Sequence, residues 1–413
     1  MDAMQAGMTT FERGMEGAMA MIASQPAGPV AAGATVPVFR PDITQEEIDA
    51  MAATMRSGWI GPGPRVAEFE AQFTRAFDVP HAVAVASGTA ALQAALAALD
   101  VKPGDEVIIP SFTWVSVFQV VSGLGATPVF ADIEPGHLTV DPEDVARLVT
   151  PRTRGIVAVH HGGQLADIDA LAGIARQHGL WLVDDAAHAC GAAWRGRPVG
   201  GLCTMTTFSF NAMKNLSIGD GGMVTTSDPR LAHRAALYRS LGIDRDTYCR
   251  YGDAATPRST RWCYDVVSAG QRIHMNDLAA SVGLVQLRRL AQLNGRRGRL
   301  VARYDERLND VSGLRRVHAR TGTQPSHHMY TVRMADRDGF IDRMARWGIS
   351  IGVHYIPIHL FEVARPFRRE LPVTEEIWRQ VTTFPLYPAM TDEEQDRVVA
   401  AARESARVSC ARC

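Results

Sequence analysis

The stretch Trp181-Leu-Val-Asp-Asp-Ala-Ala-His188 joins a short apolar run to two acids and a histidine. Its first three residues lack the polar alternation of a half-exposed strand, which indicates a strand that is covered on both faces. Six similar runs alternate with helical stretches along the chain, at residues 82–86, 106–109, 127–130, 155–159, 206–210 and 223–225. This rhythm predicts an α/β fold with a mostly parallel sheet of seven strands sandwiched by helices.

The pattern changes to longer helical segments after about residue 277, with a strand near 330–334. Two capping boxes, Thr44-Gln-Glu-Glu47 and Thr391-Asp-Glu-Glu394, each predict the start of a helix, the first of them on the surface. Residues 1–35 are rich in Ala, Gly and Met without periodic patterning, so we expect a poorly ordered extension. We therefore predict a large domain at 36–277 and a smaller C-terminal α/β domain at 278–413.

The composition excludes several classes of function. The 413 residues are 46% hydrophobic and 21% charged with a net charge of −1, so we expect a compact protein with no nucleic-acid or membrane partner. Six cysteines show neither the density of a disulfide framework nor the paired spacing of a zinc site, which favours a cytoplasmic protein without a metal. No apolar run approaches the roughly 20 residues of a membrane span, and no signal peptide is recognisable. The terminal pair Cys410 and Cys413 is assigned no role.

In a parallel sheet, ligands bind at the carboxyl ends of the strands, so the loops after the strands carry the chemistry. The first of these loops, Ser87-Gly-Thr89, leads directly into an Ala- and Leu-rich helix. Amide groups and hydroxyls at a helix N-terminus attract anions, so we expect Ser87, Gly88 and Thr89 to bind a phosphate. Taken alone, the motif is equally typical of an ordinary N-cap.

Asp184 and Asp185 directly follow the apolar run at 181–183. Because adjacent residues of a strand point to opposite faces, we expect one acid to face a ligand and the other to cap the following helix. Taken alone, the pair would be interpreted as two capping or solvated acids.

Lys214 stands beyond another strand, five residues after Ser209 and shortly before Gly219-Asp-Gly-Gly222. Most lysines are solvated surface charges, but a partly desolvated amine in such a loop can act as a Schiff-base nucleophile. The three loops together supply an anion seat, a carboxylate and a lysine, which is the set that pyridoxal 5′-phosphate (PLP) requires. The sequence therefore predicts a PLP site in the large domain.

Several further motifs occur in a fixed order with these loops. They are Ser57-Gly-Trp-Ile-Gly-Pro-Gly63, Ser87-Gly-Thr-Ala-Ala-Leu92, Pro110-Ser-Phe-Thr-Trp114, Asp185-Ala-Ala-His188, Phe208-Ser-Phe-Asn-Ala-Met-Lys214, His354-Tyr355 with Pro357 and His359, and Phe384-Pro-Leu-Tyr-Pro388. In these motifs the chain, from about residue 36 to residue 399, resembles the DegT/DnrJ/StrS family of sugar aminotransferases. That resemblance implies the aspartate aminotransferase-like fold, known as fold type I of PLP enzymes.

The resemblance also implies roles for individual residues. Lys214 and Asp185 would be catalytic, Lys214 by binding the cofactor covalently and moving protons, and Asp185 by pairing with the pyridine nitrogen. His188 would contact the phenolic oxygen of the cofactor. Trp114 would stack on the ring, although an aromatic residue after a strand is more often core packing. The positions that match phosphate contacts in the family are Gly88, Thr89 and Ser209.

The segment Gly270-Gln-Arg-Ile-His-Met-Asn-Asp277 stands where many family members read Gly-Tyr-Asn-Tyr-Arg-Met-Thr-Asp, in a loop lent by the neighbouring subunit. The resemblance therefore implies a homodimer with shared active sites. Arg272 takes the place of an asparagine at the cofactor phosphate, which an arginine can also bind. His274 stands where arginine is common. The residues expected to face the substrate are Trp59, His274, His354, Tyr355 and His359.

The sequence thus predicts a PLP-dependent aminotransferase that moves an amino group from glutamate or glutamine to a keto sugar, with a nucleotide-linked keto-hexose favoured, in amino-sugar biosynthesis. A keto-cyclitol aminotransferase and an aminobenzoate-type synthase keep the same lysine and stay open. A non-catalytic regulatory homologue is the alternative from another class. A sugar dehydratase of this fold is disfavoured, because those relatives replace the lysine by histidine and Lys214 is present.

Overall fold

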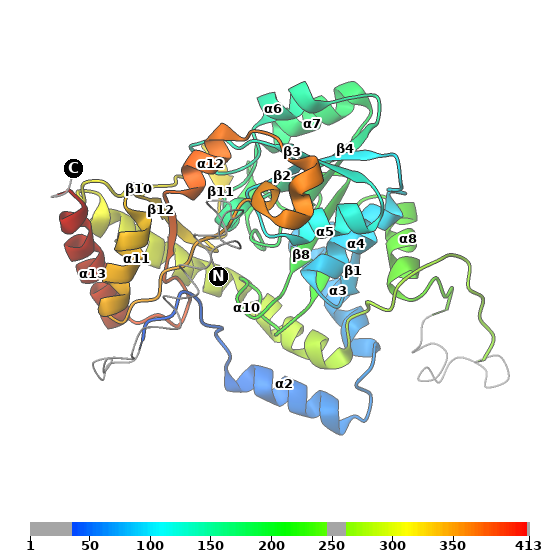
Figure 1. The fold of residues 1–413 in the computed structure, drawn as a ribbon. Helices are drawn as coiled ribbons and strands as arrows, with labels where there is room; N and C mark the ends of the chain where they lie inside the picture. The colour runs from blue at the N-terminus through cyan, green and yellow to red at the C-terminus, as the bar shows by residue number, and fades with distance from the viewer. Residues whose placement is uncertain (1–34, 246–261, 411–413) are drawn as a thin grey trace, which may run out of the picture.

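The computed structural model describes residues 35–245 and 262–410 of the chain (Figure 1). The predicted extension at residues 1–35 lies outside the described residues except for residue 35, and so does Cys413. Within the described ranges, no helix combines the length and apolar content needed to cross a membrane. Nor do three His, Cys, Asp or Glu side chains of these ranges lie together as metal ligands would.

Seven strands form the central sheet, and Figure 1 shows helices packed around it. In spatial order the strands are β1 (His81–Val85), β9 (Gly222–Thr226), β8 (Met205–Ser209), β5 (Trp181–Asp185), β4 (Thr153–Val159), β2 (Glu106–Pro110) and β3 (Thr127–Ala131). Neighbouring strands pair in parallel except at β9, which is antiparallel to both β1 and β8. The prediction of an α/β fold with seven mostly parallel strands is confirmed.

Alternate strand residues feed the cores on the two faces of the sheet. Val183 packs into one core and its neighbour Leu182 into another. The helices of the Val183 face are α4 (Gly88–Ala98), α5 (Ser116–Gly123) and α8 (Pro229–Arg239). Those of the opposite face are α3 (Pro64–Phe77), α6 (Pro142–Leu148), α7 (Ile168–His178) and the first half of α10 (Asp277–Leu308). Both faces are buried, as unbroken apolar runs require.

A further core surrounds the second half of α10. Because the first half of this helix packs on the central sheet, α10 joins the part of the chain around that sheet to the C-terminal part. This core contains residues of β12 (Tyr330–Arg333), β13 (Val381–Phe384), α11 (Arg337–Arg346) and α13 (Asp392–Cys410), and β10 (Arg315–Arg316) pairs with β12 in the same sheet. A small third sheet consists of β11 (Thr323–Gln324), β6 (Ala193–Trp194) and β7 (Arg197–Pro198). The division into domains after residue 277 stays a prediction.

The chain returns to the large sheet after residue 357, through η4 (Ile358–Leu360), η5 (Glu362–Phe367) and α12 (Pro372–Trp378). Ile358 and Ala364 are buried in the core of α4 and α5. Thr374 donates both its amide and its hydroxyl to Asp132, at 2.8 and 2.7 Å. Figure 1 shows this orange segment lying beside α5 and β3. Residues from the end of the chain are thereby placed at the carboxyl edge of the sheet.

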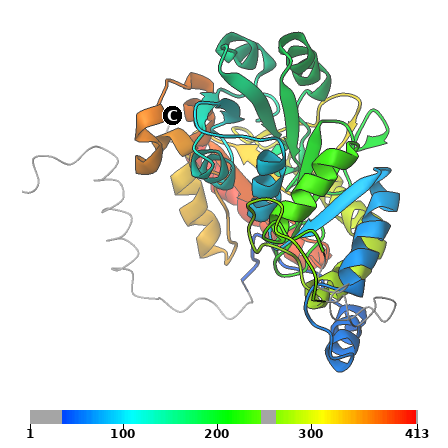
Figure 2. The same cartoon turned by 90° about the vertical axis from the view of Figure 1, so that its right-hand side faces the viewer.

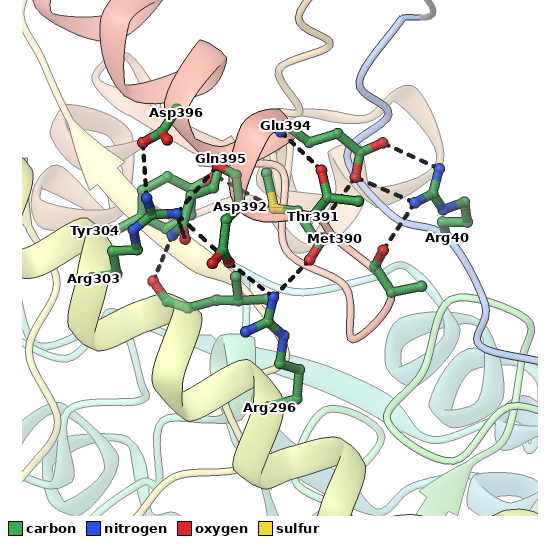
Figure 3. A network of polar contacts seen from close by, with 12 residues as sticks. Arg40, Arg296, Arg303, Tyr304, Met390, Thr391, Asp392, Glu394, Gln395 and Asp396 are labelled. Carbon is green, nitrogen blue, oxygen red and sulfur yellow. Dashed lines mark hydrogen bonds and ion pairs between the residues drawn. The ribbon is translucent and has the colours of Figure 1, made fainter.

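The second predicted capping box is present at α13 and anchors the N-terminal segment (Figure 3). The Thr391 amide donates to the Glu394 carboxylate at 2.9 Å, and the Glu394 amide donates to the Thr391 hydroxyl at 3.1 Å. Both oxygens of the same carboxylate accept from Arg40, each at 3.3 Å. Arg40 also donates to the Ala389 carbonyl at 3.1 Å. This network fixes the position of the neighbouring Phe39.

The first predicted capping box is present at the start of α2 (Gln45–Arg56). The Thr44 amide donates to the Glu47 carboxylate at 2.8 Å. Glu47 is only 1% exposed, and it also accepts from Gln286 and Arg289 of α10, at 2.7 and 2.5 Å. Burial alone would raise the pKa of Glu47, but the hydrogen bonds from Thr44, Arg289 and Gln286 outweigh it and lower the pKa to about 2. Glu47 therefore ties α2 to α10 as a charged group.

Replacing Glu47 by Gln should destabilise the protein near neutral pH. A carboxylate whose pKa is 4.5 when unfolded and about 2 when folded stabilises the folded state above pH 4.5, and this contribution is lost as the pH falls toward 2. We expect Glu47→Gln to lower the free energy of unfolding by about 2 kcal/mol at neutral pH. The difference from the wild type should shrink in acid, as urea denaturation followed by circular dichroism would measure.

The neighbouring Glu46 provides the control for this prediction, because its side chain is 57% exposed and pairs with Arg288 at the surface. Glu46→Gln should leave the stability almost unchanged. A Glu47→Gln effect of the same size in acid and at neutral pH would contradict the charged role of Glu47.

Candidate active site

A cavity of about 520 Å³ lies at the carboxyl ends of β4, β5 and β8, where a parallel sheet binds its ligands. Most of the residues that the sequence indicated line it: Ser87, Gly88, Thr89, Trp114, Asp185, His188, Ser209, Lys214, His354 and Tyr355. The structure thus brings the three predicted loops together in one site, with the His354-Tyr355 segment beside them.

Gly88, at the start of α4, lies so close to Ser209 that a Cβ atom at residue 88 would stand 2.6 Å from the Cβ of Ser209. The Ser87 hydroxyl caps the helix by accepting a hydrogen bond from an amide of the first turn at 3.1 Å. The hydroxyls of Thr89 and Ser116 lie 2.8 Å apart. The first turn carries no acidic residue. The amides and hydroxyls at this end of α4 therefore form an anion cradle, which suits a phosphate.

Asp184 and Asp185 have different surroundings, as expected for adjacent residues of a strand. Asp185 lines the cavity and accepts a hydrogen bond from the Ala187 amide at 3.1 Å, and burial raises its pKa. Asp184, on the opposite face of β5, is wholly buried 3.7 Å from Nε2 of His160. The expectation that the second acid, Asp184, caps the following helix is wrong. Asp184 lies beside His160, and the amide of the following turn donates to Asp185 instead.

The loop after β8 holds Lys214 in the cavity. Its backbone is fixed by hydrogen bonds from the Lys214 amide to the Asn211 carbonyl and from the Ala212 amide to the Gly219 carbonyl, both at 2.9 Å. Burial lowers the pKa of Lys214 to about 8, although the charge of Asp185 acts in the opposite direction. At neutral pH a larger share of this amine is neutral than in an ordinary lysine, as a nucleophile requires.

His188 is neutral in this site, and its tautomer is fixed. The Gly162 amide donates to Nδ1 at 3.3 Å, so the ring hydrogen must lie on Nε2. Burial, followed by the charge of Lys214, keeps the pKa of His188 well below its usual value. Nε2 lies 3.2 Å from the Tyr355 hydroxyl and donates to it. The hydroxyl hydrogen of Tyr355 is therefore left for a ligand in the cavity.

Sequence reasoning missed Phe39 and His328, which also line the cavity. The ring of His328 stacks on His188 with centroids 4.6 Å apart, and Phe39 stacks on His328 at 5.4 Å. The His354 ring meets the edge of Phe39 at 5.5 Å, and burial lowers the pKa of His354 to about 4. The histidine pair before β12 was a usable signal for His328. The sequence around Phe39 gives no signal of a site. Phe39 reaches the cavity because its neighbour Arg40 is held by residues near position 390, which are remote in the chain.

Four predicted residues do not line this cavity: Trp59, Arg272, His274 and His359. His359 is only 2% exposed, and its Nδ1 lies 2.7 Å from the Ser111 hydroxyl. The Ser111 hydroxyl also accepts from the His359 amide at 3.1 Å. This position gives His359 a structural role, in which it joins η4 to the end of β2.

The segment 270–277 runs along the edge strand β1 of its own chain, where His274 forms an antiparallel bridge and Arg272 is exposed. The loop that contains Trp59 lies next to this segment, held by a hydrogen bond from the Asp277 amide to the Gly61 carbonyl at 3.0 Å. These three predicted residues are thus gathered on one side of the chain, outside its own cavity.

The cavity fits PLP group by group. The anion cradle suits the phosphate, Asp185 suits the pyridine nitrogen and Lys214 suits the aldehyde. Fold and site together define a PLP-dependent enzyme of fold type I. The family model described as the DegT/DnrJ/EryC1/StrS aminotransferase family matches residues 41–403. The chain belongs to this family and is a PLP-dependent aminotransferase, as predicted.

Similar proteins cover almost the whole chain. SpsC of Bacillus subtilis (strain 168), a spore coat polysaccharide biosynthesis protein, is 36% identical over 380 residues, which are 89% of this chain and 96% of SpsC. The aminotransferase TlmJ from Streptoalloteichus hindustanus is 34% identical, with a TM-score of 0.85 over 91% of this chain and 100% of TlmJ. Spr1654 from Streptococcus pneumoniae, assigned as a sugar aminotransferase, has been solved in a PLP-form and a PMP-form. Its PMP-form is 30% identical, with a TM-score of 0.84 over 90% of this chain and 99% of Spr1654.

The lowered pKa of Lys214 predicts how the apoenzyme takes up its cofactor. Because only the neutral amine attacks an aldehyde, the rate constant of covalent attachment should rise with pH and level off above about 8. Stopped-flow absorbance after mixing with PLP measures this rate. In Asp185→Asn the plateau should begin at lower pH, because the charge that raises the Lys214 pKa is gone. A rate that keeps rising to about pH 10, as for an ordinary lysine, would contradict the desolvated amine.

Proposed function

We propose that this aminotransferase transfers an amino group from glutamate or glutamine to the ketone of a nucleotide-linked keto-hexose in the cytoplasm. The observation that carries the proposal is the meeting of Lys214, Asp185 and the anion cradle in one cavity. The sugar acceptor is supported by the relatives, since SpsC is named for polysaccharide biosynthesis and Spr1654 is assigned as a sugar aminotransferase. The volume of about 520 Å³ suits the cofactor together with the hexose ring of the acceptor.

PLP, when bound, supplies a ring that stabilises negative charge on the carbon next to the transferred nitrogen. Lys214 would hold the cofactor and, once the amino donor has displaced it, carry a proton on Nζ. The same amine serves both halves of a ping-pong reaction. Asp185 would keep a proton on the pyridine nitrogen, and its burial favours this pairing because few other groups solvate the carboxylate.

The remaining cofactor contacts follow from the cavity walls. Trp114 is 59% exposed there and would cover one face of the ring. His188 would contact the phenolic oxygen side of the cofactor, together with the Tyr355 hydroxyl to which it donates. His354 would face the acceptor. The phosphate would be held by Ser87, Gly88, Thr89 and Ser209.

We also propose a homodimer. The helix α2 turns Ile48, Met51 and Met55 outward, with 53%, 40% and 57% of each residue exposed. The buried Glu47 of the same helix faces α10. An apolar stripe on the outer side of a helix is typical of a surface that another chain covers.

The dimer would have shared active sites. Arg272, His274 and Trp59 lie outside the cavity of their own chain. A second copy would bring its Arg272 to the cofactor phosphate and its His274 and Trp59 to the acceptor. Arginine suits the first of these roles because its guanidinium forms paired hydrogen bonds with phosphate oxygens.

A panel of nucleotide-linked keto-hexoses and keto-inositols tests the acceptor. Each compound is mixed with the pyridoxamine form of the enzyme, and the return of the aldehyde absorbance is followed. We expect a nucleotide-linked keto-hexose to react fastest. Faster reaction with keto-inositols would replace the sugar acceptor by a cyclitol, and no release of 2-oxoglutarate from glutamate with any acceptor would favour a regulatory homologue.

Matched variants accompany the panel, because the chain has only two lysines, Lys102 and Lys214. Lys214→Ala should abolish transamination and the visible absorbance of the bound cofactor. Lys102 is 61% exposed, and Lys102→Ala should change neither. Borohydride reduction and mass spectrometry should locate the cofactor on Lys214. An adduct on Lys102, or full activity of Lys214→Ala, would refute the assignment.

Mixing two inactive variants tests the shared site. Lys214→Ala and Arg272→Ala should each have little activity. In an equal mixture, half of the dimers should contain one chain of each kind, and each of these mixed dimers has one intact site of two. The mixture should therefore recover about a quarter of the wild-type activity. Sedimentation should give about twice the 44.9 kDa of one chain. Failure of the mixture to recover activity would place Arg272 outside the partner's site, and an active monomer would exclude the dimer.

A further inference from the structure

Asn215 directly follows Lys214 in the chain, but it does not line the Lys214 cavity. It is only 2% exposed, and its Nδ2 donates to Oδ1 of Asn294 and to the Ser326 carbonyl, each at 2.7 Å. Asn294 belongs to α10, and Ser326 lies shortly before β12. One side chain therefore joins the loop that carries Lys214 to two segments that are remote in the sequence.

The orientation of these side-chain amides is fixed by their partners. A backbone carbonyl can only accept a hydrogen bond, so the Asn215 atom beside the Ser326 carbonyl must be the nitrogen. That nitrogen requires the oxygen of Asn294 to face it, which leaves the Asn294 nitrogen to donate to the Cys190 carbonyl at 2.9 Å. Donors and acceptors thus match throughout the network. We call Asn215, Asn294 and Ser326 the clamp.

The clamp also holds the turn that carries His188. The Ser326 hydroxyl donates to the His188 carbonyl at 2.6 Å. Gly191 of the same turn has a φ of +84°, and a Cβ atom there would lie 2.5 Å from Nδ2 of Asn294, so the turn packs directly on the clamp. The two loops that present Lys214 and His188 to the cavity are therefore joined to each other behind it.

The backbone hydrogen bonds of the Lys214 loop run among its own residues 210–221, so they shape the loop without placing it against the rest of the protein. Contacts that cross to α10 place it. Besides the clamp, the Ser217 amide donates to the Gln286 side-chain oxygen at the longer distance of 3.3 Å. Asn215 makes the shorter bonds and is the direct neighbour of Lys214, so its side chain determines most closely where the lysine lies.

The clamp contains no titratable side chain, so a change in it alters the access of water to Lys214 without adding or removing a charge. The titratable side chains that line the cavity with Lys214 are Asp185 at the end of β5, His188 in the following turn, Asp220 in the lysine's own loop, and His328, His354 and Tyr355 from the C-terminal part. Burial lowers the pKa of the three histidines and raises that of Tyr355, so all four are neutral near pH 7. The charge of Asp185 raises the pKa of Lys214.

We propose that Asn215 is a positioning residue for the aminotransferase reaction, which keeps the Lys214 amine out of water by holding its loop against α10 and the segment around Ser326. Asn215 acts through Lys214 and contacts no ligand itself. Without its two hydrogen bonds the loop would move away from α10, and water would reach the amine. This role concerns the lysine alone, so it does not depend on which acceptor is aminated.

Competitive labelling of the apoenzyme with acetic anhydride tests the proposal, because only neutral amines react and the chain has just two lysines, Lys102 and Lys214. Mass spectrometry follows both lysines in the same sample, with the exposed Lys102 as the reference. In the wild type, Lys214 labelling should rise with pH and level off above about 8. In Asn215→Ala we expect the plateau about one pH unit higher, so that labelling at pH 7, as a fraction of its plateau, falls about tenfold.

Ser326→Ala is the matched control. It removes a fully buried hydroxyl and its bond to the His188 carbonyl, but it keeps the backbone carbonyl to which Asn215 donates. Ser326→Ala should therefore lower the stability and leave the pH dependence of Lys214 labelling unchanged. A shift of the same size in Ser326→Ala, or an unchanged pH dependence in folded Asn215→Ala, would overturn the proposal.

Asn294→Ala provides a second test from the other side of the clamp, at a half-buried residue. It removes the side-chain partner of Asn215 and should move the plateau in the same direction as Asn215→Ala. The double variant should shift it by less than the sum of the two, because both changes break one network. Should Asn215→Ala fail to fold, Asn294→Ala decides alone, and an unchanged plateau in it would overturn the proposal.

Discussion

Lys214 can act as a nucleophile because its amine is removed from water, although the nearby carboxylate of Asp185 opposes the loss of its proton. Burial brings its pKa down to about 8, and Asp185 limits the fall. The two residues lie at the ends of β8 and β5, which are neighbours in the sheet although they are almost thirty positions apart in the chain. The strand order is therefore what brings the two residues together.

The cavity depends equally on the parts of the chain that lie far from the sheet in sequence. Phe39, His328 and Tyr355 form its walls together with strand-end residues. Phe39 is held by the contacts of Arg40 with the start of α13, and Tyr355 precedes the segment that packs into the core of α4 and α5. The site is complete only when both parts of the chain are folded, because neither part supplies all of its lining residues.

Much of this could be predicted from the sequence, and the reason is local. The strands and both capping boxes have signatures within a few residues of sequence. The loops that follow parallel strands must also meet at one edge of the sheet, so the site could be located from these loops. The position of His359 could not be predicted, because its partner Ser111 is remote in the chain. The place of Phe39 in the cavity could not be predicted either, because it depends on contacts of Arg40 with Ala389 and Glu394, which are remote in the chain. The apolar stripe of α2 can be seen in the sequence as apolar residues at helical spacing. Which side of the helix faces outward cannot, because that depends on the contacts of Glu47 with α10.

Four histidines lie in or against the cavity, and burial lowers the pKa of each: to about 3 for His161, about 4 for His354, and well below the usual value for His188 and His328. Such a lining stays uncharged from mildly acidic to alkaline conditions. The neutral imidazole rings can accept or donate a hydrogen bond without adding a positive charge beside Lys214. A change of pH would therefore leave these four rings uncharged, and the response of the cavity would come mainly from Lys214, whose pKa burial lowers to about 8, and Asp185, whose pKa burial raises.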